Sequence, residues 1–261
     1  MKRLAIILSI CLAATPHYAA WTSVGSLVAK ANITAADPVN WTTTATLEAG
    51  NVAVCAIASD NDGNGTDTDD IVGVTYGTET MISVGENEYD NGTTAAGAVV
   101  GIYYLKAEGQ QNSGVTVAVD MSASRTAHGL SCWEFTITAG NTVSSVGTEQ
   151  KEDVTGDAGA LTLGGLSDAG HLWVRAIASE TTNASISTPS GGFSVFTSST
   201  GSTGTAATSM GVAAEFIIAT ATTETSDPTM SASSDRASSM IALDEIAPVT
   251  SVTRRRILIA Q

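Results

Sequence analysis

The chain has 261 residues, a formal net charge of −15 and 14% charged residues, while 43% of its residues are hydrophobic. The hydrophobic content excludes a disordered chain, and the length suits one or two domains. Residues 21–246 contain all 26 acidic residues but only six of the eleven basic ones, which argues against nucleic-acid binding because this body repels phosphate.

Residues 1–20 form a hydrophobic leader. The leader has a basic start, an apolar run at Leu4–Ala14 and an end, Tyr18–Ala20, that resembles an A-x-A cleavage site. This arrangement is typical of a secretory signal peptide. The run is too short to cross a bilayer, so no membrane span is expected in the mature chain. The alternative is a hydrophobic strand that the mature protein retains.

The body of the chain repeats one sequence pattern in order. Ser23–Gly25 returns as Ser145–Gly147, and Ala56–Ser59 returns as Ala176–Ser179. The other matches are Glu48–Asn51 with Asp168–His171, Ile102–Tyr104 with Glu215–Ile217, Met121–Ser124 with Met230–Ser233, and Glu134 with Glu245. We therefore predict two homologous domains, residues 21–138 and 139–247, followed by a basic tail, residues 248–261.

Short apolar runs separated by Gly-rich turns predict strands in both repeats. In the first repeat they are 51–59, 71–76, 80–84, 98–106, 115–121 and 130–137; in the second they are 160–163, 172–179, 193–196, 211–219 and 240–246. The predicted fold class is all-β, with two tandem antiparallel β-sandwiches of the Ig-like or jelly-roll type. The link 139–142 is short, so end-to-end stacking is expected. Side chains alternate between the two faces of a strand, so along residues 52–58 and 172–178 every second side chain is expected to face the core. Cys55 and Arg175 lie on the opposite face, which is expected to be a solvated or interface side.

Cys55 and Cys132 each lie inside a predicted strand of the first repeat. An oxidising compartment would allow a disulfide between them. The second repeat has Arg175 and about Leu243 at the matching positions, so its fold needs no bridge. Two free core cysteines are the favoured interpretation.

An acidic loop follows the predicted strand 51–59, which contains Cys55. Its ligand candidates Asp60, Asp62, Asn64 and Asp67 place oxygen atoms near Gly63 and Gly65, which resembles the opening of a calcium loop. Ile71 stands where a bidentate Glu is expected, and the second repeat has no such cluster. A Ca²⁺ site in a β-loop and a solvated acidic loop both remain open.

The C-terminus combines three arginines with an apolar segment: Arg254, Arg255, Arg256, Ile257, Leu258 and Ile259. Such a segment can add to an open sheet edge of a neighbouring subunit, with the arginines meeting its acidic body. A frayed tail is the alternative.

Catalytic sequence motifs are lacking. No nucleophile elbow, P-loop, zinc-binding helix motif or dinucleotide motif occurs, so no catalytic residue is assigned and an enzyme is not expected. Trp21, Trp41 and Trp173 could stack on sugars of a cell-surface glycan, whereas Trp133 is expected in the core.

Four segments carry a family resemblance: Ala49–Val54, Val74–Gly77, Ala98–Lys106 and Trp133–Phe135. Together they resemble tandem β-sandwich proteins of tailed bacteriophages, over about residues 23–246. The resemblance implies a non-enzymatic virion protein, such as a decoration, head-fibre or tail-fibre subunit.

Such a subunit would form homo-oligomers and bind other virion proteins through edge-strand and interface contacts. The alternatives are a secreted bacterial surface, adhesin or filament subunit with a cleaved leader, and a carbohydrate-binding module.

Overall fold

The computed structural model describes residues 21–60, 70–93, 96–166, 170–201, 208–219, 221–232 and 234–248. The leader 1–20, the loop 61–69 and the tail 249–261 lie outside these residues, and the interpretations made for them stay predictions. The described residues form antiparallel sheets, which confirms the predicted all-β class.

The first half of the chain builds a large sheet and a smaller one. The large sheet has the order β1–β9–β3–β7–β6, with β1 (Thr22–Asn32), β9 (His128–Thr136), β3 (Val52–Asp60), β7 (Ala96–Lys106) and β6 (Ile82–Thr93). The smaller sheet has the order β2–β8–β4–β5, with β2 (Val39–Thr42), β8 (Thr116–Met121), β4 (Ile71–Tyr76) and β5 (Glu79–Thr80). We call this pair the first sandwich.

The second half builds the second sandwich. Its large sheet has the order β10–β19–β12–β16–β14, with β10 (Thr142–Gly156), β19 (Ser234–Ile246), β12 (His171–Ser179), β16 (Met210–Ala219) and β14 (Ser194–Val195); β15 (Ser199–Gly201) also pairs with β16. Two short ladders cover its outer face: β11 (Leu161–Leu163) with β17 (Glu224–Ser226), and β13 (Ile186–Thr188) with β18 (Thr229–Met230).

The two large sheets have corresponding strand orders and registers. Val52 of β3 pairs with Phe135 of β9, and Leu172 of β12 pairs with Leu243 of β19 in the same place. The separation of 120 residues between the two central strands, expected from the sequence repeat, therefore agrees with the register.

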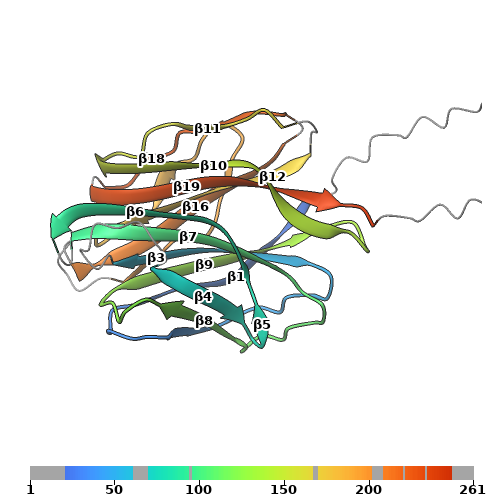
Figure 1. Cartoon of the computed structure of the whole chain (residues 1–261), viewed down its shortest axis with the longest axis horizontal. Helices are drawn as coiled ribbons and strands as arrows, with labels where there is room; N and C mark the ends of the chain where they lie inside the picture. Colours follow the sequence, from blue (N-terminus) through green and yellow to red (C-terminus); the bar gives the residue numbers. More distant parts are fainter. Residues whose placement is uncertain are drawn as a thin grey trace, which may run out of the picture.

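The two sandwiches pack face to face, so the expected end-to-end stacking is wrong. One continuous apolar cluster joins the large sheets and includes Val54 and Ala56 of β3 with Val174 and Ala176 of β12. The result is four layers, with the small sheets outermost (Figure 1). The end-to-end expectation failed because a short link fixes only the distance between domains, whereas apolar residues on both faces of each central strand require two covering layers.

Packing between the large sheets relates the two halves by an approximate two-fold axis. β1 lies against β15 while β6 lies against β10, and β9 lies against β16 while β7 lies against β19. Exchanging the two halves converts the β1–β15 contact into the β6–β10 contact, and the β9–β16 contact into the β7–β19 contact. The interface of a symmetric dimer has the same property. The molecule is thus organised as a covalently linked pseudo-dimer.

Small residues allow the large sheets to approach closely. Ala56, Ala58, Ala176 and Ala178 are fully buried between them. At Gly129 of β9, a Cβ atom would lie 3.0 Å from the backbone nitrogen of Val212. A side chain here would push the sheets apart, because packed interiors have few voids to absorb it.

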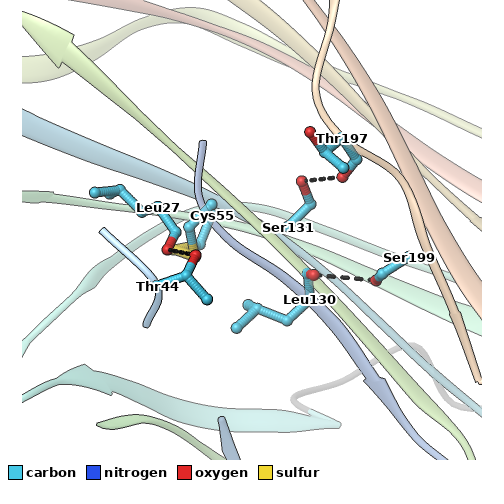
Figure 2. Close-up of a disulfide and its surroundings, with 8 residues drawn as sticks. Leu27, Thr44, Cys55, Leu130, Ser131, Thr197 and Ser199 are labelled. Atoms are coloured by element: carbon cyan, nitrogen blue, oxygen red, sulfur yellow. Dashed lines mark hydrogen bonds between the residues drawn. A yellow bond between two sulfur atoms is a disulfide. The ribbon is translucent and has the colours of Figure 1, made fainter. Parts of the chain in front are cut away.

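Polar side chains seal the two long edges of this shared core. At one edge Ser131 Oγ donates to the carbonyl of Thr197 (2.7 Å), and Ser199 Oγ donates to the carbonyl of Leu130 (3.0 Å), as Figure 2 shows. At the other edge Asn87 Nδ2 donates to the carbonyls of Glu152 and Ser238. These bonds satisfy backbone acceptors where the apolar contact ends.

Candidate functional site

Three carboxylates meet at one end of the central strands, and this cluster is the candidate site. Asp60 ends β3, Glu180 follows β12 at the matching position, and Asp235 lies at the start of β19. Gly97 of β7 donates its N–H to Glu180 Oε2 (3.1 Å), and the N–H of Glu180 donates to the carbonyl of Asp235 (3.0 Å). The Glu180 side chain therefore connects one sandwich to the other.

Burial raises the pKa of Glu180 to about 7. The hydrogen bond from Gly97 opposes this rise, while the charges of Asp235 and Asp60 add to it. Glu180 was not among the site residues expected from the sequence. The separation of 120 residues between the central strands makes Glu180 the equivalent of Asp60 in the second repeat, but this equivalence does not indicate that the two residues lie close together.

The described ends of the acidic loop are firmly anchored. Arg125 Nη2 lies 2.7 Å from Asp70 Oδ1 in a buried ion pair, and Ser122 Oγ donates to the same oxygen. The N–H of Asp60 donates to the carbonyl of Ala127. Of the predicted calcium ligands, Asp60 is described and buried, while Asp62, Asn64 and Asp67 lie outside the described residues. The described residues alone hold no group of three or more His, Cys, Asp or Glu side chains arranged for a metal ion.

His128 lies next to Ser59 of β3, inside the first sandwich. Its Nε2 is 2.9 Å from the carbonyl oxygen of Arg125, and its Nδ1 is 3.1 Å from Ser59 Oγ. Burial lowers the pKa of His128 to about 4, assisted by the positive charge of Arg125 and opposed by the hydrogen bond to its carbonyl. His128 is therefore neutral near pH 7 and serves as a fixed hydrogen-bonding group.

An ionic network occupies the core of the second sandwich. Arg175 of β12 is fully buried, and its Nη2 donates to Glu152 Oε2 (2.8 Å) and Ser238 Oγ (3.0 Å). Its Nη1 donates to the carbonyls of Gly159 (2.7 Å) and Ser226 (2.9 Å). Burial lowers the pKa of Arg175, while Glu152 and Glu215 oppose this effect. The expectation of a solvated or interface side for Arg175 is wrong, because the short outer ladders cover that face.

Glu215 of β16 completes this network from the next strand. Its Oε1 accepts from the hydroxyls of Ser190 (2.5 Å) and Ser226 (2.6 Å), and its Oε2 accepts from the N–H of Ser190 (2.9 Å). Glu215 is paired with Arg175 across the ladder. This carboxylate is hydrogen-bonded within the core and fully buried, as expected of a structural group.

Cys55 and Cys132 form a disulfide, so the favoured expectation of two free cysteines is wrong. They are directly opposite in the β3–β9 ladder, where the short distance between neighbouring strands brings the sulfurs together. Both are fully buried, and this side of β3 packs against the smaller sheet rather than solvent. The register places Met240, not Leu243, opposite Arg175 in the second sandwich.

Glu134 and Glu245 hold two similar turns. Glu134 Oε1 accepts from the N–H of Glu48 and the side-chain amide of Asn51, and Glu245 Oε2 accepts from the N–H of Thr138 and the side-chain amide of Asn141. Both turns read Ala-Gly-Asn, and both glycines have positive φ. The register nevertheless aligns Glu134 with Ala242, so the sequence match of the two glutamates reflects a shared local motif and not equivalent strand positions.

The proposed sugar-stacking tryptophans do not form an exposed surface. Trp21 and Trp41 are 5% exposed and Trp173 is 0% exposed, because these rings fill the cores. A hollow of about 310 Å³ lies at the four-stranded sheet, between Gly73, Thr75, Thr80, Ala118 and Asp120. Its lining contains no aromatic ring on which a sugar could stack.

The predicted assembly segment, Arg254 to Ile259, lies outside the described residues. Three of the sheet edges to which such a strand could add, β1, β6 and β10, each carry at least one register shift. Bulges of this kind twist an edge and interrupt the row of free backbone groups. They restrict strand addition along these three edges.

Within the described part of the chain, no helix is long and apolar enough to cross a membrane. Comparison with protein-family models, curated proteins and solved structures found no match.

Proposed function

We propose that the protein is a non-enzymatic structural subunit of a phage virion, of the decoration, head-fibre or tail-fibre type. The observation that carries the proposal is the shared core, which joins two sandwiches into one rigid four-layer body. Two of its fully buried ionisable side chains bind other groups of the core: Arg175 binds Glu152, and Glu215 binds Ser190 and Ser226. A body of this kind suits a subunit that forms part of a particle or is displayed on its surface.

Assembly in this proposal uses the C-terminal segment. Three arginines precede the apolar residues Ile257–Ile259, and the body to which they would dock is strongly acidic. Electrostatic attraction would guide the segment, and burial of its apolar side chains would hold it. The bulged edges β1, β6 and β10 would limit non-specific pairing between subunits.

Two measurements test this proposal together. Mass spectrometry of purified particles should find the chain as a stoichiometric component; its absence from particles would reject the virion assignment. Deleting residues 254–261 should abolish self-association in light scattering while the circular dichroism spectrum stays unchanged. Replacing only Arg254, Arg255 and Arg256 with Ala separates the contribution of charge from that of the apolar strand. Unchanged assembly of the deletion variant would reject the docking role.

A secreted surface or filament subunit is the second candidate, and the disulfide favours it. Disulfides persist in oxidising compartments, and the Cys55–Cys132 pair is buried where it stabilises the first sandwich. The mass of the mature chain separates the two candidates. A chain that starts at Met1 supports the virion, whereas a start near Ala20 or Trp21 supports export and removal of the leader.

A further inference from the structure

The hollow at the four-stranded sheet lies on the outer face of the first sandwich. Thr75 of β4 pairs with Thr80 on one side and with Ala118 on the other, and Gly73 pairs with Asp120 further along. These five residues line the hollow, and most of them have small side chains. A Cβ atom added at Gly73 would meet nothing within 4 Å, so the space above this residue is open.

A bulge in β4 places apolar side chains beside the hollow. The register of β4 with β8 shifts just before Gly73 and leaves Val72 without a partner on β8. The N–H of Met81 donates to the carbonyl of Val74, so the chain still follows β4 at this point and brings Ile82 to the same border. Val72 is 60% exposed and Ile82 52%, and only one other large apolar side chain in the described part of the chain is more than half exposed. Exposed apolar groups gathered beside a hollow indicate a contact surface.

The charge at the hollow is negative. Asp120 is exposed, and it has no ion-pair partner among the described residues. Asp37 precedes Pro38, which also lines the hollow, and its Oδ1 accepts the N–H of Met121 at 3.0 Å. This bond holds a second carboxylate close to Asp120. A partner that fits this surface therefore combines positive charge with apolar side chains.

The C-terminal segment of this chain has both properties. Its three arginines, Arg254–Arg256, stand directly before the apolar residues Ile257–Ile259. The leader also places two basic residues, Lys2 and Arg3, before an apolar run, but it has one positive charge fewer. In the body of the protein, all three arginines are buried and bound to carboxylates: Arg125, Arg175 and Arg236.

We propose that this hollow is the docking site for residues 254–259 of a second copy of the chain. The arginines meet Asp120, and the apolar residues cover Val72 and Ile82. The inference rests on the assembly role proposed above for the C-terminal segment and adds the surface that receives it. Attraction between opposite charges brings the segment to the hollow, and burial of the apolar side chains keeps it there.

The arginines of the same chain fall short of its own hollow. β19, which precedes the segment, lies two sheet spacings, or about 20 Å, from the four-stranded sheet (Figure 1). β8 begins at Thr116, at the end of the molecule where β19 ends, and Asp120 lies about 13 Å further along it. The chain from Pro248 to Arg254 spans at most about 21 Å. The segment therefore meets the hollow of a neighbouring copy.

The first test compares self-association of the full-length protein with that of three variants. Asp120→Asn removes the charge, and Gly73→Val fills the hollow without meeting other atoms at Cβ. The control Asp153→Asn makes the same change of charge at an exposed position of β10, in the second sandwich. Light scattering should show an association constant about 5-fold lower for Asp120→Asn, the effect of one ion pair, and at least about 10-fold lower for Gly73→Val. The control should match the wild type.

The outcomes separate this inference from the assembly role of the segment. If deleting residues 254–261 abolishes association while Asp120→Asn and Gly73→Val leave it unchanged, the segment docks elsewhere and the hollow is rejected. If the deletion leaves association unchanged, the assembly role fails together with this inference. If Gly73→Val still weakens association after the deletion, the hollow receives another segment, such as the leader, and the assignment to residues 254–259 is overturned.

A second measurement does not depend on the hollow variants. The full-length variant Arg254→Ala/Arg255→Ala/Arg256→Ala is titrated with a synthetic peptide of residues 251–261. NMR should show shifts of the Gly73, Thr75 and Ala118 amides, and binding should weaken as salt is added. Shifts confined to other surfaces would reject the hollow. In the wild type, hollow amides that take the docked shifts at concentrations where the protein is monomeric would show docking within one chain and overturn the role of the second copy.

Discussion

Replacing Arg175 with Met should destabilise the protein strongly. Its guanidinium makes four hydrogen bonds of 3.0 Å or less, to Glu152, Ser238, Gly159 and Ser226. Removing it also leaves Glu215, which is fully buried, without the positive charge opposite it in the ladder. Breaking a buried ion pair by removing one partner costs about 3–5 kcal/mol. Since about 1 kcal/mol changes the melting temperature of a chain of this size by about 2–4 °C, we expect a decrease of about 10 °C.

Denaturant unfolding and calorimetry at pH 7 check this value, with Lys151→Met as the control. Lys151 is also basic and paired, with Glu149 at 3.5 Å, but its side chain is 50% exposed. Exposed pairs contribute about 0–1 kcal/mol, so the control should differ little from the wild type. A loss below about 1 kcal/mol at pH 7 would refute the assignment of Arg175 as the centre of this core.

Three further changes test other parts of the structure. The double variant Cys55→Ala/Cys132→Ala opens a link across a sequence separation of 77 residues and should lose about 4 kcal/mol in denaturant unfolding; equal stability of the variant and the oxidised wild type would contradict the disulfide. Gly129→Ala should cost about 1–3 kcal/mol by pushing against the backbone of Val212. Gly109→Ala meets nothing within 4 Å and should stay within about 0.5 kcal/mol, so similar losses in these two variants would argue against close sheet contact at Gly129. The calcium hypothesis for Asp60, Asp62, Asn64 and Asp67 predicts that EDTA lowers the melting temperature in calorimetry; an unchanged temperature rejects it.

The central strands could be predicted because both of their faces are buried. Residues 52–58 are a continuous run of apolar side chains and residues 172–178 are apolar except for Arg175, and β3 and β12 occupy these segments. The edge strands β1 and β10 were not predicted. They lie at the sheet margins, carry many Ser, Thr, Gly and charged residues, and expose much of their length, so they lack the apolar pattern of a strand.

Other features depend on contacts between distant segments, which a local pattern does not report. Cys55 and Cys132 could be identified as a possible pair, but only the register shows that they are directly opposite. The role of Arg175 depends on partners in four separate segments, around residues 152, 159, 226 and 238. The calcium loop and the C-terminal segment remain predictions from sequence.

The central claim is that the two sandwiches share one core, and cutting the link between them tests it most directly. A protease site inserted between Ala139 and Gly140 would allow the folded chain to be cleaved in the turn that joins β9 to β10. We predict that the two fragments, shown to be separate on a denaturing gel, still elute together at the mass of the intact chain, because the apolar cluster between the large sheets holds them. Separate elution of two folded fragments in native buffer would contradict the shared core.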